Sequence, residues 1–261
     1  MNLGSIEFSI IVPAFLAGLL VLSTHVPLGQ EVLARGIIFI DLAIAQIAGL
    51  GVIAAQSFGW EPQGWEVQIT AGGAALLGAT LFNFTEEHWP EIQEAIIGVV
   101  FVLAASGGLL LLSNNPHGGE HLRDLMVGQI LWINVSTLAP VAILYALVLA
   151  LWLGMGTRIG RPGFYLIFAL SVTASVQLVG VYLVFASLII PALTTRRLAG
   201  MQRLFTGYGM GAAAYAIALL ISSWWDLPTG AVIVWCLAAL GLMLSTCLWI
   251  FSECRSGIIK S

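Results

Sequence analysis

Apolar runs long enough to cross a lipid bilayer recur from one end of this chain to the other. A membrane-spanning helix needs about 20 mostly apolar residues, because the hydrocarbon core is about 30 Å thick. Such runs, some of them shorter, fall at about residues 8–26, 36–57, 67–84, 92–113, 126–153, 163–180, 181–195, 204–224 and 229–251. Helices satisfy their own backbone polar groups in lipid. The sequence therefore predicts one domain over residues 1–261, an all-α polytopic transmembrane bundle of about 8–9 membrane segments.

The charge content of the chain agrees with this prediction. Soluble domains carry about a quarter charged residues, whereas this chain has 8% charged and 59% hydrophobic residues and a mean hydropathy of +1.00. The net charge of −4 is too small to indicate an acidic or a basic partner, and no nucleic acid is expected to bind. The first run has Glu7 before it instead of Lys or Arg, so we expect a retained helix and not a signal peptide.

Two kinds of chemistry are not expected from this sequence. The three cysteines show no CxxC spacing, which argues against a zinc site or a disulfide. No GxxxxGK[ST] phosphate loop is present, so the chain itself is not expected to hydrolyse a nucleotide. The sequence therefore does not predict an enzyme.

The distribution of basic residues orients the chain, because Lys and Arg gather in cytoplasmic loops. With the N-terminus outside and two passes within residues 163–195, Arg123 alone lies outside. The cytoplasmic side then receives Arg35, Arg158, Arg161, Arg196, Arg197, Arg203, Arg255 and Lys260. One long helix over residues 163–195 would instead place Arg158 and Arg161 opposite the Arg196 group. The sequence thus favours two short helices that meet near QLVGVY, at Gly180.

A helix broken within the membrane is a candidate functional element. Broken backbone at membrane depth is tolerated where it is buried in protein or lines a cavity, and transporters place their sites near such breaks. Pro191 in SLIIPALTTRRL lacks a backbone donor and predicts irregular helix near the inner end. Gly180 and Pro191 therefore mark a candidate discontinuous element, and the alternative for Pro191 is a kink in an ordinary span.

Asp41 is the one carboxylate within the apolar stretch IIFIDLAIAQIAGLG, residues 37–51. A mid-helix Asp costs about 2.5–3.5 kcal/mol on insertion scales, so it should face the bundle interior or a hydrated path. Asp41 is either a cation ligand or a structural residue near the interface that pairs with Arg35 or caps a helix. Gln46, five residues on, could supply a neutral oxygen to the same path.

Other polar residues are weaker candidates. The amides Gln129 and Gln177 either line the path or join helices by hydrogen bonds. The segment SNNPHGGEHLRD is either a solvated loop or a metal-capture loop that uses His117, Glu120 and His121. Its proline and glycines oppose the helix that a zinc-peptidase HxxEH motif would need.

Two further groups of polar residues receive structural interpretations. His25 precedes VPLG at the end of the first run and is expected at the membrane interface. The acidic segment FTEEHWPEIQE is expected to favour the dipole of the helix that begins near Ile92. A surface for docking a partner is the alternative for this segment.

Four segments carry a family resemblance: PLG…ARGIIFIDLAIA, EAIIGVVFVLAASGGLLLLS, LMVGQILWI and VGVYLVFASLIIPALTTRRLAG. They resemble the membrane permeases of the zinc/manganese ABC transporters, and WWDLPTGAVIVWCLAALGLMLS is similar to that family's final hairpin. The resemblance covers most of the chain in the family's order. It implies a multi-pass permease subunit of the bacterial inner membrane with no permanently bound cofactor. It also implies a homodimer, cytoplasmic ATPase subunits and an extracytoplasmic metal-binding protein.

The same resemblance implies uptake of zinc, manganese or iron by alternating access, along a path lined partly by the second span and by Asp41. The chain departs from the family in two places. Members of the family usually carry a His four residues after this Asp, where Ala45 stands here, and a Gly-Asp where Gly128–Gln129 stands here. The cytoplasmic segment that docks on the ATPase is shortened to LGMGTRIGRPG, in which Arg158 and Arg161 are candidate contacts.

These departures keep two alternatives open. One is a non-transporting membrane scaffold or sensor that retains the permease fold, because the metal pair is incomplete and the coupling segment is short. The other is a carrier that works without ATP.

Overall fold

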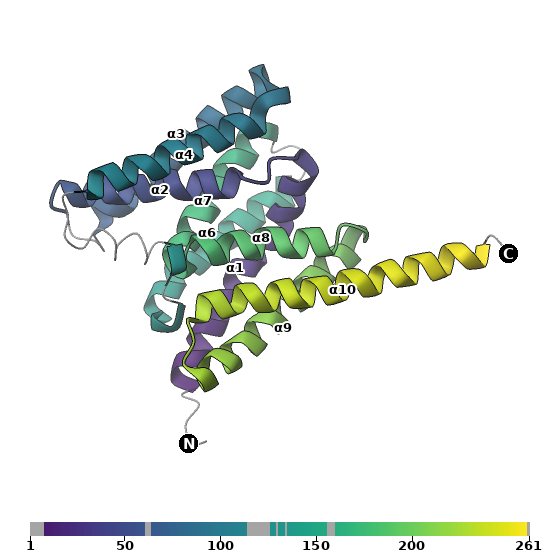
Figure 1. Cartoon of the computed structure of the whole chain (residues 1–261). Helices are drawn as coiled ribbons and strands as arrows, with labels where there is room; N and C mark the ends of the chain where they lie inside the picture. The colour runs from purple at the N-terminus through teal and green to yellow at the C-terminus, as the bar shows by residue number, and fades with distance from the viewer. Residues whose placement is uncertain are drawn as a thin grey trace.

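The computed structural model of the chain describes residues 8–60, 64–113, 126–128, 130–133, 135–155 and 160–259. The described residues form helices, turns and short connections without any strand (Figure 1). The long helices are α1 (Phe8–Arg35), α2 (Ile40–Ser57), α3 (Trp65–His88), α4 (Gln93–Leu112), α6 (Val135–Met155), α7 (Gly160–Val179), α9 (Gly200–Trp225) and α10 (Thr229–Ile259). The shorter elements are α8 (Val181–Thr194) and the 3-10 turns η1 (Pro90–Ile92) and η2 (Ile130–Trp132).

Eight helices of the described part are long and apolar enough to cross a membrane, and α8 is a shorter apolar helix. The predicted all-α transmembrane bundle is therefore confirmed. The first helix is longer than the sequence predicted, because α1 continues through Pro27 to Arg35. Prolines are tolerated in membrane helices, where neighbouring helices and polar side chains satisfy the freed backbone groups. The expected interfacial position of His25 is wrong, since its side chain is fully buried inside the bundle.

The helix junctions gather at two opposite ends of the bundle. The α1–α2, α3–α4 and α8–α9 junctions lie toward the end from which the C-terminal half of α10 extends (Figure 1). The α2–α3 and α9–α10 junctions lie at the opposite end. Arg35 ends α1, and Arg196 and Arg197 lie between α8 and α9, so these basic residues share the predicted cytoplasmic end.

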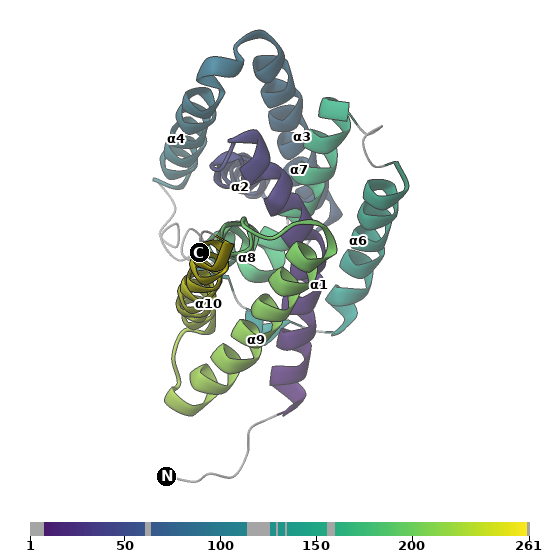
Figure 2. The ribbon, with the colours of Figure 1, turned by 90° about the vertical axis from the view of Figure 1, so that its right-hand side faces the viewer.

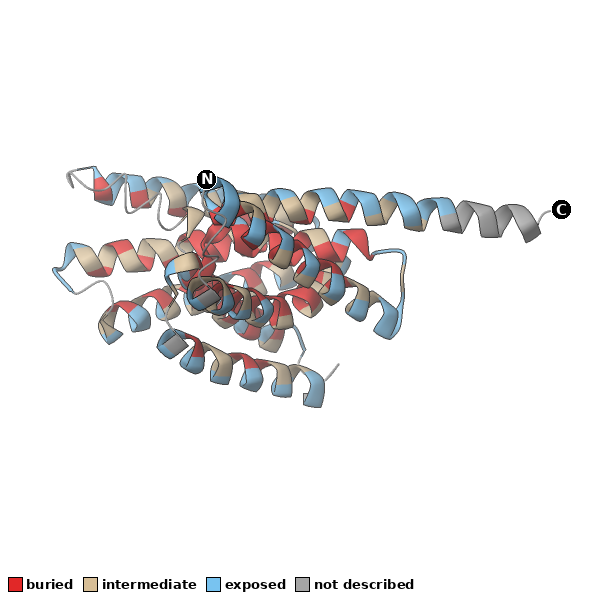
Figure 3. Cartoon of the chain, turned by 90° about the horizontal axis from the view of Figure 1, so that it is seen from below, coloured by how far each residue is buried: buried red, intermediate tan, exposed pale blue. Residues whose placement is uncertain are grey.

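The core is built around α2 and α7. Within the most apolar 18-residue stretch of each helix, 61% of the residues in α2 and 67% of those in α7 are buried, against 17% in both α6 and α10. α2 packs against α3 and α4, and α1 packs against α8 and α9 (Figure 2). The buried residues concentrate in the centre of the bundle, while outer helices present exposed apolar faces (Figure 3). Exposed apolar faces of this kind are expected where helices meet lipid.

The break between α7 and α8 falls at Gly180, as the sequence predicted. Gly180 has a φ of 82° and separates Val179 from Val181. The irregular helix expected at Pro191 is not observed, because α8 continues through Pro191 to Thr194. The backbone N–H and the hydroxyl of Thr195 both donate to the Pro191 carbonyl, at 3.1 and 2.7 Å. These two bonds keep the last turn of α8 regular.

Candidate functional site

Asp41 lies in the first turn of α2 and is fully buried. Neither of its carboxylate oxygens has a hydrogen-bond partner in the described part of the chain. Most buried polar groups in proteins are satisfied, so an unpaired buried carboxylate calls for an explanation. The interpretation of Asp41 as a structural partner of Arg35 is not supported, because Arg35 binds other groups.

The turn that leads into α2 is held by Arg35. Its Nε donates to Glu31 Oε1 at 2.8 Å, and its Nη1 lies 3.9 Å from Glu86 Oε1 on α3. The guanidinium carbon also lies 4.2 Å from the ring centroid of Phe164 on α7. A guanidinium over an aromatic face gains a cation–π attraction. The end of α1 is thus fastened to α3 and α7 just ahead of Asp41.

The N-terminus of α2 is held from the other side by Glu94 on α4. Phe39 precedes the helix and has no side-chain acceptor for the free N–H groups of the first turn. Glu94 Oε1 accepts a hydrogen bond from the Phe39 N–H at 3.1 Å. A carboxylate at a helix N-terminus is also favoured by the helix dipole. The sequence suggested that this acidic segment serves its own helix, whereas Glu94 caps a helix 55 residues away along the chain.

Gln93 joins further helices near the start of α2. Its amide Nε2 donates to the Phe82 carbonyl at 3.0 Å and to the Tyr165 hydroxyl at 3.4 Å. These bonds join α4 to α3 and α7. Asp41 therefore sits at a rigid corner whose polar contacts do not use its carboxylate.

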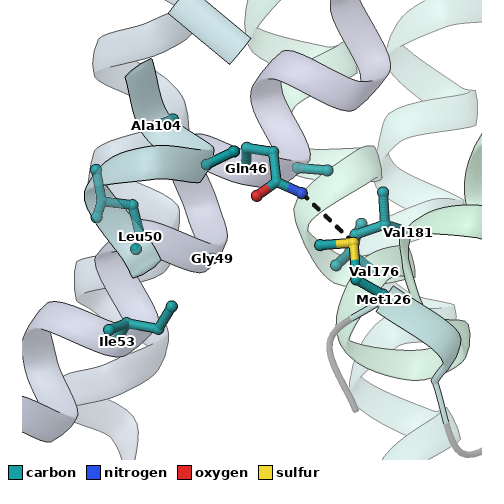
Figure 4. A pocket seen from close by; sticks show the side chains of 11 residues that line it. Gln46, Gly49, Leu50, Ile53, Ala104, Met126, Val176 and Val181 are labelled. Carbon is teal, nitrogen blue, oxygen red and sulfur yellow. Dashed lines mark hydrogen bonds between the residues drawn. The ribbon is translucent and has the colours of Figure 1, made fainter. Parts of the chain in front are cut away.

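Gln46 lies further along α2, and its side chain is nearly buried, at 8% exposure. Its Nε2 donates to the thioether sulfur of Met126 at 3.7 Å (Figure 4). Five residues turn a helix by about 140°, so Gln46 and Asp41 do not share one face. Ala45, one turn beyond Asp41 on the same face, lines a small cavity together with Gln46 and Met126. The cavity therefore begins one turn from Asp41.

The remaining candidates that the structure describes are not brought together with Asp41. Gln177 is exposed on α7, and Arg161 is exposed in the first turn of α7. Other predicted residues lie outside the described part of the chain: His117, Glu120, His121, Gln129 and Arg158. Among the described residues, no three His, Cys, Asp or Glu side chains are grouped so that they could hold a metal ion.

Met126 is the residue of this region that sequence reasoning missed. Its signal is weak, because a methionine in an apolar run is usually only a flexible core residue. Its place two residues before Gly128, in LMVGQILWI, is the one hint in the sequence. The hydrogen bond with Gln46 joins residues that are 80 positions apart, which no local pattern reveals.

The arrangement favours brief binding of a cation over tight storage. Tight structural metal sites surround the ion with about four protein ligands. Among the described residues, one fully buried carboxylate is available here. The amide of Gln46 lies on another face of α2, and the thioether of Met126 contacts that amide from a different segment. A single negative charge in a dry environment attracts a cation strongly but leaves most of its coordination unfilled. Such a residue can bind an ion briefly while the ion moves along a transport path.

Comparison with known proteins supports a transport role. The chain matches the family model "ABC 3 transport family" over residues 7–157 and 149–248. It is 24% identical over 254 residues to "High-affinity zinc uptake system membrane protein ZnuB" of Haemophilus influenzae, covering 89% of this chain and 95% of that protein. It is also 24% identical over 163 residues to "Probable iron transport system membrane protein" of the same organism. That match covers 54% of this chain and 60% of the length of that protein.

The fold is similar to a solved structure as well. A chain of "PsaBC from Streptococcus pneumoniae in complex with Fab" superposes with a TM-score of 0.72 at 21% sequence identity. The superposition covers 91% of each chain.

Proposed function

This chain belongs to the ABC 3 transport family, and on that basis we propose that it is the permease subunit of a divalent-metal uptake transporter. The cargo is zinc, manganese or iron; the names of the two relatives state zinc for one and iron for the other. The observation that carries the proposal is the fully buried carboxylate of Asp41, which has no hydrogen-bond partner among the described residues. Charges inside membrane proteins are costly and commonly mark ion paths.

Asp41 is the charged residue that binds the ion transiently on the metal path. A divalent cation that loses part of its hydration shell gains the carboxylate charge in return. Because Ala45 stands where the family usually has a His, the ion keeps more of its water or takes neutral oxygen from the partner protomer. Both features weaken binding of the metal ion at Asp41 and favour its release.

The chain works in a homodimer with ATPase subunits in the cytoplasm and a metal-binding protein on the outer side of the inner membrane. ATP binding and hydrolysis on the ATPase drive alternating access of the path. Arg158 and Arg161 contact the ATPase at the predicted cytoplasmic end. Gln129 and Gln177 line the path between the protomers, and the loop with His117, Glu120 and His121 captures metal at its mouth.

The test is uptake by the complete transporter. The chain is purified with its ATPase and metal-binding protein, reconstituted into vesicles, and supplied with labelled zinc, manganese or iron. The proposal expects uptake of at least one metal that needs both ATP and the binding protein. Uptake without ATP would instead indicate a carrier, and no uptake of any of the three metals would contradict the proposal.

A second candidate is a membrane scaffold or sensor, favoured by the short connection between α6 and α7. α6 ends at Met155 and α7 begins at Gly160, so only residues 156–159 join them. The permease function needs one of the cytoplasmic junctions to bind the ATPase. Copurification from detergent separates the candidates. A bound ATPase whose activity rises with metal-loaded binding protein favours the permease, and absence of both favours the scaffold.

A further inference from the structure

Two breaks in helical backbone lie directly against each other beside α2. Gly180 separates α7 from α8 with a φ of 82°, and Gly128 has a φ of 69°. A Cβ atom on Gly128 would overlap the carbonyl group of Val179, and one on Gly180 would overlap the backbone nitrogen of Gly128. Backbone atoms cannot swing aside as a side chain can. Only glycine at both positions therefore permits this crossing.

The crossing holds Met126 against α2. Met126 lies two residues before Gly128, and Val181 directly follows Gly180. Both side chains line the cavity on the side opposite Leu50 and Ile53, and the side chain of Gln46 reaches toward Met126 (Figure 4). The cavity has a volume of about 10 Å³, which leaves room for about one water molecule at most. The hydrogen bond between Gln46 and Met126 thus joins α2 to the segment that forms the crossing and leaves little open space between them.

We propose that the Gln46–Met126 contact is a closed gate of the metal path, on the side of Asp41 away from the α1–α2 turn. The Gly128–Gly180 crossing is the joint that carries Met126 away from α2 when the gate opens. The inference rests on the proposed function, because a gate requires a transported divalent cation. It assigns to Met126 a role that no similarity to other proteins supplies.

The chemistry of the contact suits a gate. A thioether is a weak hydrogen-bond acceptor, so little is lost when the contact opens. Methionine is flexible and fills irregular gaps, which lets it seal a path in one state and withdraw in the other. Hinges absorb backbone rotation at a few element ends, and both breaks are such ends. After opening, the amide oxygen of Gln46 and the sulfur of Met126 become neutral ligands facing the ion.

The test joins the two sides of the gate in the complete transporter. Cys236, Cys247 and Cys254 are first replaced by Ala, and Gln46→Cys and Met126→Cys are then introduced together. A short bifunctional thiosulfonate reagent links the two thiols through bonds that a reductant can break. The matched control pair is Ile47→Cys with Gly78→Cys, which lies on the α2–α3 contact, where a Cβ on Gly78 would meet the Ile47 side chain.

The expected result is loss of ATP-dependent metal uptake when the Gln46–Met126 pair is linked, and recovery, after reduction, of the level that the same variant shows before linking. The linked control pair should retain its uptake. Undiminished uptake with the Gln46–Met126 pair linked, or equal loss with both pairs linked, overturns the gate and leaves the proposed function standing. Absence of uptake in the cysteine-free transporter before linking overturns the proposed function and the gate with it.

Discussion

At the scale of single residues, Asp41 is positioned by groups that do not touch its carboxylate. Arg35 fastens the end of α1 to Glu86 and Phe164, and Glu94 binds the N–H of Phe39 just before α2. The sequence alone indicated that Asp41 is buried, because an apolar run surrounds it. It could not reveal the cap from Glu94, because that contact depends on how α4 packs beside α2.

The role of Glu94 as a cap can be measured by substitution. Glu94→Ala removes the acceptor for the Phe39 N–H, and loss of a helix cap costs about 0.5–2 kcal/mol. We expect a lower thermal unfolding temperature in detergent and reduced metal uptake, because the turn that carries Asp41 loosens. Glu94→Gln keeps an acceptor oxygen and should lose less. Glu91→Ala is the matched control on an exposed acidic residue, and equal behaviour of the two Ala variants would refute the cap.

Arg35 offers a second test at this scale. Arg35→Met keeps the length of the side chain but removes the ion pairs with Glu31 and Glu86 and the contact with Phe164. The partly exposed pairs and the cation–π contact together predict a loss of about 1–2 kcal/mol in the free energy of unfolding. Chemical or thermal unfolding in detergent measures it. The exposed Arg196→Met is the control, and an equal effect in both variants argues against the fastening role.

At the scale of helices, the sequence predicted where the chain breaks better than where its helices end. The break near QLVGVY was predicted from charge alternation and falls at Gly180. Pro191 was misleading, because it lies inside a continuous helix, and the first run was predicted too short, because α1 continues through Pro27. A proline signal depends on whether neighbouring groups satisfy the freed carbonyl, and a single sequence does not contain that information.

The backbone crossing at Gly180 makes a prediction for α7 and α8. Gly180→Ala would place a Cβ against the backbone of Gly128 at a positive φ, which costs about 1–3 kcal/mol. We expect a lower unfolding temperature of the purified protein. Gly72→Ala in α3 is the control, because nothing lies within 4 Å of the added Cβ there. Helical Ala is favoured over Gly, so the control should be unchanged or more stable.

A Gly180→Ala variant as stable as the wild type would contradict the crossing. It would mean that the two breaks are separated in the protein and do not touch. The gate inferred at Gln46 and Met126 would then lack the crossing about which Met126 is proposed to move.

At the scale of the whole molecule, successive helices run in alternating directions, which places the basic junctions at one end of the bundle. Composition and run length were enough to predict a polytopic bundle, because lipid leaves few alternatives to helices. The packing order around α2 and α7 was not predictable, since apolar runs carry no information on their neighbours. Labelling with a membrane-impermeant thiol reagent tests the orientation.

In a cysteine-free background in intact cells, Asp226→Cys between α9 and α10 should react from outside. Arg196→Cys, between α8 and α9, should react only after the membrane is opened. Both positions are exposed in the structure. The reverse pattern would invert the predicted orientation of the chain.

In the proposed mechanism, a divalent metal passes Asp41. The most direct measurement is ATP-dependent metal uptake by vesicles that contain the complete transporter with Asp41→Asn, which keeps the size of the side chain and removes its charge. The exposed Asp226→Asn serves as the control, and copurification with the ATPase checks assembly. We expect uptake at the level seen without ATP for Asp41→Asn and unchanged uptake for the control. Undiminished uptake by an assembled Asp41→Asn transporter would contradict this mechanism.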